Sequence, residues 1–132
     1  MQAEEIKQCV VEALEEIKAR EIVVLDTRKL TPMFDYMIVA SAESTRQTKA
    51  LARNVEDKIR GGGGKVLGSE GEQAGEWVLV DMGSVIVHIM QPAIREYYNL
   101  EQLWGGDGTR RVSQLRRVTD ILATDERDSV RP

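Results

Sequence analysis

The fold is decided by the stretch Gly75-Glu76-Trp77-Val78-Leu79-Val80-Asp81-Met82-Gly83-Ser84-Val85-Ile86-Val87-His88-Ile89-Met90, which holds two β-branched runs on either side of a tight glycine turn. The turn is formed by Met82-Gly83, by Gly83-Ser84 or by a four-residue loop of the same parity. Each of these sorts the side chains into the same two faces, because neighbouring residues along a strand point to opposite faces. We therefore expect a hairpin here.

The two faces of this hairpin differ in character. The first is apolar and is expected to form core: it consists of Val78, Val80, Met82, Val85, Val87 and Ile89. The second mixes aromatic, acidic and imidazole groups, which a purely structural strand pair does not require: it consists of Trp77, Leu79, Asp81, Ser84, Ile86, His88 and Met90. This second face is either covered by another layer or used as a docking surface.

The composition is that of an ordinary globular domain. The chain has 132 residues, of which 42% are hydrophobic and 30% are charged. No apolar run is long enough to span a bilayer, and the first 20 residues carry five glutamates in place of a signal peptide. The single cysteine, Cys9, cannot form an internal disulfide, which fits a reducing compartment. We expect a cytoplasmic protein with no membrane partner.

Charge is unevenly distributed along the chain. Residues 1–105 contain 12 Lys or Arg against 17 Asp or Glu, whereas residues 106–132 contain six Arg against five acids. An acidic body repels phosphate backbones, which argues against direct sequence-specific binding of nucleic acid and favours a basic protein partner. The alternative is that mild acidity only keeps the protein in solution.

The periodicity of apolar residues and the turn signals predict eight elements in the order α-β-β-α-β-β-β-α. They are a helix over 3–19, strands over 21–27 and 35–42, a helix capped by Ser44 and ended by the 61–64 glycine run, a short strand over 65–68, the hairpin, and a helix over 93–103 that follows Pro92. This order predicts an α/β fold: a single domain with a mixed five-stranded sheet and flanking helices.

A domain boundary is predicted at Gly105-Gly106-Asp107-Gly108. Residues 1–105 form the domain, and residues 106–132 form a C-terminal tail that is either flexible or loosely docked. Within the domain, Cys9 falls in the apolar stripe of the first helix and is expected to be a core thiol.

The residues give no support to catalysis or to a bound cofactor. The 61–64 glycine run precedes Lys65, but a phosphate-binding loop needs an earlier glycine, Ser or Thr after the lysine, and the opposite order of strand and helix. One histidine and one cysteine cannot supply a zinc site. His88 has only Asp81 and Ser84 nearby, and Ser84 lies in the turn. No catalytic, metal or cofactor residue is therefore expected.

Five segments together resemble one known family. They are Thr31 to Ser41 (Thr-Pro-Met-Phe-Asp-Tyr-Met-Ile-Val-Ala-Ser), Ser44-Thr45-Arg46-Gln47, Glu70-Gly71, Gly75 to His88, and Arg95 to Trp104 (Arg-Glu-Tyr-Tyr-Asn-Leu-Glu-Gln-Leu-Trp). In order and spacing they are similar to the ribosomal silencing factors, also called the Iojap family, over about residues 3–105. Members commonly have Asp where this chain has Ser84, and the tail lies outside the resemblance.

The resemblance implies a protein that binds the large ribosomal subunit through ribosomal protein uL14, blocks joining of the small subunit and represses translation when nutrients are short. It also implies a topology similar to nucleotidyltransferases, so a metal-dependent enzyme of that kind is the alternative function. Those enzymes need a Gly-Ser signature and paired carboxylates. This chain has Ala40-Ser41 and no Asp-x-Asp pair, so we expect no enzymatic activity.

The residues expected to bind the partner combine aromatic and charged side chains near the end of the domain, since Trp and Tyr often dominate interfaces. They are Trp77, Asp81, His88, Tyr98, Glu101, Leu103 and Trp104. Glu96 is expected to join the acids that pair with a basic protein, whereas Tyr97 and Leu100 are expected in the core. If the Trp77 face instead pairs with its own copy, the free protein is a homodimer or a dimeric scaffold.

Overall fold

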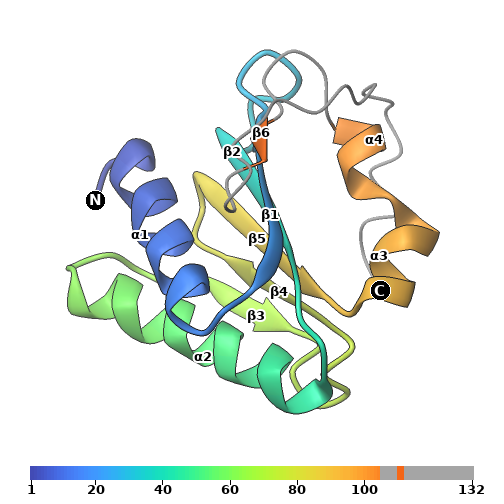
Figure 1. The fold of residues 1–132 in the computed structure, drawn as a ribbon. Coiled ribbons are helices and arrows are strands. Elements are labelled where there is room, and N and C mark those ends of the chain that lie inside the picture. The colour runs from blue at the N-terminus through green and yellow to red at the C-terminus, as the bar shows by residue number, and fades with distance from the viewer. Residues whose placement is uncertain (105–109, 112–132) are drawn as a thin grey trace.

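The computed structural model describes residues 1–104 and 110–111. One sheet of six strands, in the order β3-β4-β5-β2-β1-β6, runs through the centre with helices on both faces (Figure 1). The elements are α1 (Ala3–Glu16), β1 (Arg20–Asp26), β2 (Tyr36–Ser41), α2 (Thr45–Gly61), β3 (Gly68–Glu70), β4 (Trp77–Asp81), β5 (Val85–Met90), α3 (Pro92–Tyr98), α4 (Leu100–Trp104) and β6 (Arg110–Arg111).

The sheet is mixed, as predicted. Strand β2 runs parallel to β5, and the pairs β1–β2, β3–β4, β4–β5 and β1–β6 are antiparallel. The parallel pair is joined through α2, which is the crossover that a parallel connection requires. The five predicted strands are therefore present, and β6 adds two residues at one edge.

The hairpin of β4 and β5 has the predicted parity. Val80 lies opposite Val87 and Asp81 lies opposite Ile86, so the turn is the two residues Gly83 and Ser84. Gly83 has φ of 85°, a conformation that a side chain would strain. The Oδ1 atom of Asp81 accepts a hydrogen bond from the Gly83 N–H at 2.8 Å, which stabilises the turn.

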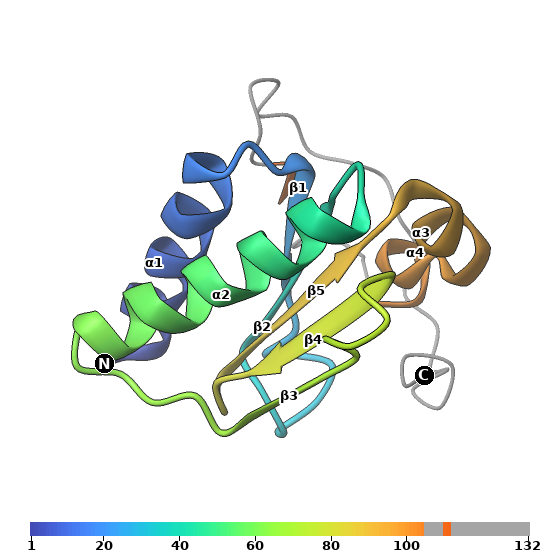
Figure 2. The same ribbon diagram turned by 90° about the horizontal axis from the view of Figure 1, so that it is seen from below.

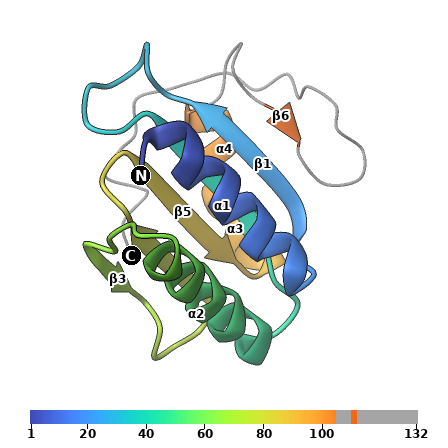
Figure 3. The ribbon, with the colours of Figure 1, turned by 90° about the vertical axis from the view of Figure 1, so that its left-hand side faces the viewer.

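Each sheet face carries its own hydrophobic core, because neighbouring strand residues alternate between the faces. The predicted apolar face of the hairpin packs entirely in the first core, which α1 and α2 cover side by side (Figures 2 and 3). The predicted mixed face contributes Trp77 and Met90 to a second core, together with Leu100 and Trp104 from α4. The second face of the hairpin is thus covered by another layer at its Trp77 end.

The helices of the first core begin and end close to the predicted positions. The Ser44 hydroxyl accepts a hydrogen bond from the Gln47 N–H at 3.1 Å, and Gln47 Oε1 accepts one from the Glu43 N–H, so the predicted cap of α2 is confirmed. Helix α1 ends at Glu16, three residues earlier than predicted. Cys9 packs against the first core, where burial raises the pKa of its thiol.

Two further predicted boundaries were wrong. The strand predicted over 65–68 lies at Gly68–Glu70, where the Leu67 N–H donates to Asp81 O and starts the pairing with β4. The single helix predicted over 93–103 is two helices, because Asn99 adopts a left-handed conformation between them. Strand β6 falls in the predicted tail, residues 106–132; the rest of that tail lies outside the described residues, and the domain boundary stays a prediction.

A buried carboxyl on α2 makes stability depend on pH. Burial raises the pKa of Glu56, and the neighbouring carboxyl of Glu72 raises it further. A carboxyl whose pKa is raised on folding contributes stability below its unfolded pKa and loses it as the pH rises through the folded value. Glu56→Gln is therefore expected to raise the Tm at neutral pH. The gain should shrink as the pH falls through the raised folded pKa of Glu56, and it should be absent below the unfolded pKa of about 4.3.

The measurement is thermal unfolding, followed by circular dichroism across pH, for this variant and for Asp57→Asn. Asp57 is the next residue of α2 and is exposed, so its substitution should change little. A Glu56→Gln protein that is less stable than wild type at neutral pH would contradict the assignment.

Candidate partner-binding site

Helices α3 and α4 lie together on the second face of the sheet, opposite α1 and α2 (Figures 1 and 2). Pro92 opens α3, where its fixed φ suits the first turn and its missing N–H costs nothing. Asn99 turns the chain with φ of 51° and ψ of 56°, so α4 starts at once in a new direction. Beyond this corner, Leu100 and Trp104 of α4 pack in the second core with side chains of β1, β2, β4 and β5.

Two buried side chains of the sheet, Trp77 and His88, lie beneath α3 and form what we call the floor of the site. The indole N–H of Trp77 donates to Nδ1 of His88 at 2.8 Å, and both residues are buried. Because Nδ1 accepts, this bond requires the imidazole to be neutral with its proton on Nε2. His88 is therefore a structural partner of Trp77 in this fold.

Three aromatic rings connect this floor to the surface. The ring centroids of Trp77 and Tyr98 are 4.6 Å apart, and those of Tyr98 and Tyr97 are 5.0 Å apart in an edge-to-face arrangement. Trp77 is 6% exposed, Tyr98 is half-buried and Tyr97 is 81% exposed. The exposed ring is thus held from below by two others, so little conformational entropy remains to be lost when a partner contacts it.

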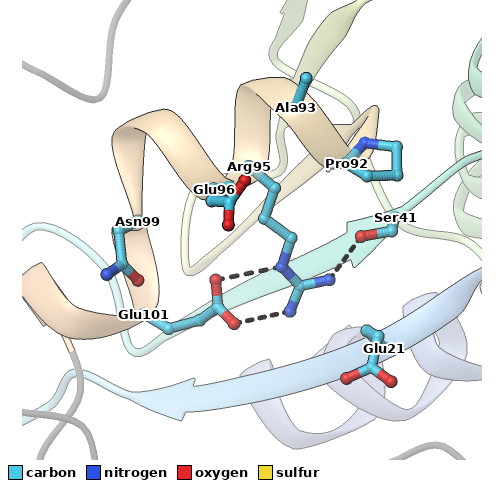
Figure 4. A pocket seen from close by; sticks show the side chains of 8 residues that line it. All are labelled: Glu21, Ser41, Pro92, Ala93, Arg95, Glu96, Asn99 and Glu101. Atoms are coloured by element: carbon cyan, nitrogen blue, oxygen red, sulfur yellow. Dashed lines mark hydrogen bonds and ion pairs between the residues drawn. The ribbon is translucent and has the colours of Figure 1, made fainter.

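An ion pair clamps α3 to α4 and to the sheet (Figure 4). The Arg95 guanidinium donates to both carboxylate oxygens of Glu101, at 3.1 and 2.8 Å, and to the Ser41 hydroxyl at 2.8 Å. The Arg95 and Glu101 side chains are only 9% and 11% exposed. This bidentate geometry fixes both helices relative to β2, since it specifies direction as well as distance.

A hollow beside this clamp is lined by acids. Glu21, Glu96 and Glu101 line it, and among the residues that the structure describes Arg95 is the only basic one in the lining (Figure 4). Glu21 lies at an irregularity of β1 and has φ of 50°. Since the charge of Glu101 is balanced by Arg95, the exposed carboxylate of Glu96 is the acid of this hollow that suits a basic side chain of a partner.

The seven residues predicted to bind a partner fall into two groups. Trp77, His88, Glu101 and Trp104 are buried, and Asp81, Tyr98 and Leu103 are half-buried. The rings of Trp77, His88 and Tyr98 meet, and Leu103 and Trp104 belong to the same core. Asp81 lies at the other end of β4, about 13 Å along the strand from Trp77.

These positions correct the roles expected for several residues. Trp77 and Trp104 were expected at the partner interface, yet both are buried. The ring centroid of Trp104 lies 5.6 Å from that of Phe34. Glu101 was expected to bind a basic partner, but Arg95 takes both of its oxygens. Tyr97 was expected in the core and is exposed, whereas Leu100 is buried as predicted. Partner contact by the seven residues stays a prediction.

Sequence reasoning left Arg95 out of this site and placed Tyr97 in the core. Arg95 and Glu101 are six positions apart, a spacing that does not share a helix face, so the break at Asn99 is needed to bring them together. Tyr97 and Tyr98 are adjacent, and only the docking of α3 decides which one points outward. The Pro92 opening and the Asn99 at the corner were the available signals.

Two searches of the structure bear on other kinds of site. Within residues 1–104 and 110–111, no three His, Cys, Asp or Glu side chains gather as metal ligands would. In the same part of the chain, no helix is both long enough and apolar enough to cross a bilayer.

Comparison with known proteins gives consistent matches. The family model described as "Ribosomal silencing factor during starvation" matches residues 1–131, and so includes the tail that the sequence resemblance had left out. A "Ribosomal silencing factor RsfS" from Chromobacterium violaceum is 54% identical over 106 residues, covering 80% of this chain and 87% of that protein.

Solved structures agree with these matches. A crystal structure of a protein from Chromobacterium violaceum superimposes with a TM-score of 0.78 at 53% identity, covering 81% of this chain and 89% of that one. A crystal structure from Bacillus halodurans gives a TM-score of 0.73 at 30% identity, covering 83% and 99%.

Proposed function

Because this chain belongs to the family of ribosomal silencing factors, we propose that it binds the large ribosomal subunit through ribosomal protein uL14 and prevents the small subunit from joining. The action is steric and stoichiometric, takes place in the cytoplasm, and represses translation when nutrients are limited. The observation that carries the proposal is the exposed Tyr97 ring, supported by Tyr98 and Trp77 beside an acid-lined hollow.

This arrangement has the features of a protein-binding hot spot. Aromatic side chains that are held rigidly contribute most to such interfaces. The exposed Glu96 beside the hollow is suited to Lys or Arg of a basic ribosomal protein, and such a charge speeds association and fixes orientation. The face formed by α3 and α4 is therefore the surface through which the chain docks.

The proposed action needs no catalysis. The Ser41 hydroxyl accepts a hydrogen bond from Arg95 within the clamp and is thereby held in a structural role. A sucrose gradient of ribosomal subunits at low magnesium tests the proposal: the added chain should travel with the large subunit and reduce the fraction of joined ribosomes. An enzyme would instead turn over a nucleotide substrate and require a divalent metal.

Tyr97→Ser locates the docking surface. We expect it to weaken binding to the large subunit by about 30-fold, corresponding to the loss of about 2 kcal/mol at a hot spot. Its Tm should match that of wild type, because the ring is 81% exposed. Binding is measured by co-sedimentation with purified large subunits over a range of concentrations.

Leu67→Ser is the matched control. Leu67 is also exposed, at 66%, and lies beside Asp81 at the far end of β4 from Trp77. It should bind as wild type does. If Tyr97→Ser also binds as wild type does, the α3–α4 face is not the docking surface.

A further inference from the structure

The outer side of α2 carries a stripe of basic residues on an otherwise acidic body. Arg46, Lys49, Arg53 and Arg60 are separated by three, four and seven positions. With 3.6 residues per turn they fall within about 60° of the helix circumference and extend over about 21 Å. This basic stripe points away from the buried residues Leu51, Val55 and Ile59.

The basic stripe is accessible and largely uncompensated. Arg46, Arg53 and Arg60 are exposed and Lys49 is half-buried. Within the described residues, Arg46, Lys49 and Arg53 form no ion pair, and Arg60 lies 3.5 Å from Glu56. Three basic side chains outside the stripe do form ion pairs: Arg20 with Glu43, Arg28 with Asp26 and Lys58 with Glu16.

Charge is segregated between the two helices of the first layer. Helix α1 carries five Glu and one Lys, whereas α2 carries five Lys or Arg against Glu56 and Asp57. The two helices lie side by side (Figure 3). The overall charge of the chain argued against a nucleic-acid partner, but this local distribution gives α2 an excess of three positive charges, with Glu56 and Asp57 at the two edges of the stripe.

We propose that the basic stripe of α2 binds the phosphate backbone of duplex RNA. A row of cations about 21 Å long fits a line of regularly spaced phosphates better than it fits a compact anion. Three of its four members are arginines, whose planar guanidinium suits phosphate oxygens. Nothing in the stripe reads base edges, so the contact is independent of sequence, as is typical for double-stranded RNA.

The stripe and the α3–α4 face lie on opposite sides of the sheet (Figure 2). Both surfaces can therefore be occupied at the same time. The RNA contact goes beyond the proposed docking on a ribosomal protein and does not depend on it. On a ribosomal particle, where RNA surrounds the protein sites, such a contact would fix the orientation of the bound chain.

The test is fluorescence anisotropy of a labelled RNA duplex of mixed sequence, titrated with the full chain at several salt concentrations. For wild type, a plot of log K against log salt should have a slope of about −3, since about three to four neutralised phosphates release their counterions. The double variant Arg46→Gln/Arg53→Gln should bind about ten-fold more weakly at low salt, and its slope should be shallower by about 2.

Lys18→Gln/Lys29→Gln is the matched control. It removes the same amount of charge from two exposed lysines outside α2, and should keep the wild-type slope. The proposal fails if wild type does not bind the duplex at low salt, or if both double variants lose affinity equally. It also fails if the Arg46→Gln/Arg53→Gln change instead dissociates a dimer in sedimentation, because the stripe would then contact α1 of a second copy.

Two further measurements separate this proposal from the proposed function. Tyr97→Ser should bind the RNA duplex as wild type does, and the Arg46→Gln/Arg53→Gln variant should still bind purified uL14. Loss of RNA binding in the Tyr97 variant would overturn the assignment to the stripe, whereas failure of uL14 binding in wild type would affect only the proposed function.

Discussion

Arg95→Ala is expected to lower the free energy of unfolding by about 3–5 kcal/mol, because it leaves the buried Glu101 carboxylate without its partner. The guanidinium also holds Ser41, so the substitution detaches α3 and α4 from β2 at the same time. Urea unfolding followed by far-ultraviolet circular dichroism measures the loss. Hydrogen exchange of the amides of α4 shows whether that helix opens first.

Two controls separate the buried clamp from ordinary surface charge. Arg20→Ala breaks an ion pair with Glu43 whose side chains are 66% and 56% exposed, so it should cost at most about 1 kcal/mol. The double variant Arg95→Met/Glu101→Leu removes both charges and should recover most of the stability. If Arg95→Ala costs no more than Arg20→Ala, the pair does not hold the helices in place.

Trp77→Ala is expected to lower the free energy of unfolding by about 3–5 kcal/mol, because it leaves a cavity beneath α3. Trp77→Phe keeps a ring against Tyr98 but removes the indole N–H, so the buried Nδ1 of His88 loses its donor. That change should cost about 1–3 kcal/mol. Both losses are read from urea unfolding curves.

A double-mutant cycle isolates the hydrogen bond. In a His88→Leu background no acceptor remains, so Trp77→Phe should cost about 1 kcal/mol less than it does in wild type. Equal costs in the two backgrounds would mean that the 2.8 Å contact contributes nothing. Because Trp77 is buried, weaker ribosome binding by Trp77→Ala would reflect a damaged fold and would not locate the interface.

The parts of the fold that follow from local rules could be predicted from the sequence. The two faces of the hairpin are set by a period of two and a glycine turn. The start of α2 is set by the Ser44 hydroxyl, which accepts a hydrogen bond from the Gln47 N–H. Each depends on residues close together in the chain. The mixed sheet followed from the order of these elements.

The parts that depend on docking could not be predicted in the same way. Strand β3 was expected at residues 65–68, but the pairing with β4 begins with the Leu67 N–H and continues over residues 68–70. The burial of Trp77 required knowing that α3 and α4 return over the sheet, which the corner at Asn99 makes possible. The likeness of the topology to nucleotidyltransferases stays a prediction.

The ring contacts from Trp77 through Tyr98 to Tyr97 make the fluorescence of Trp77 a reporter of binding at Tyr97. The fluorescence of an indole ring changes with neighbouring aromatic rings and with a hydrogen bond from its N–H. The Trp77 ring contacts the His88 ring and donates a hydrogen bond to it. A partner that binds to Tyr97 should change the fluorescence of Trp77 through the Tyr97–Tyr98 and Tyr98–Trp77 ring contacts. With Trp104→Phe removing the other indole, the arrival of a partner is visible in an unlabelled sample.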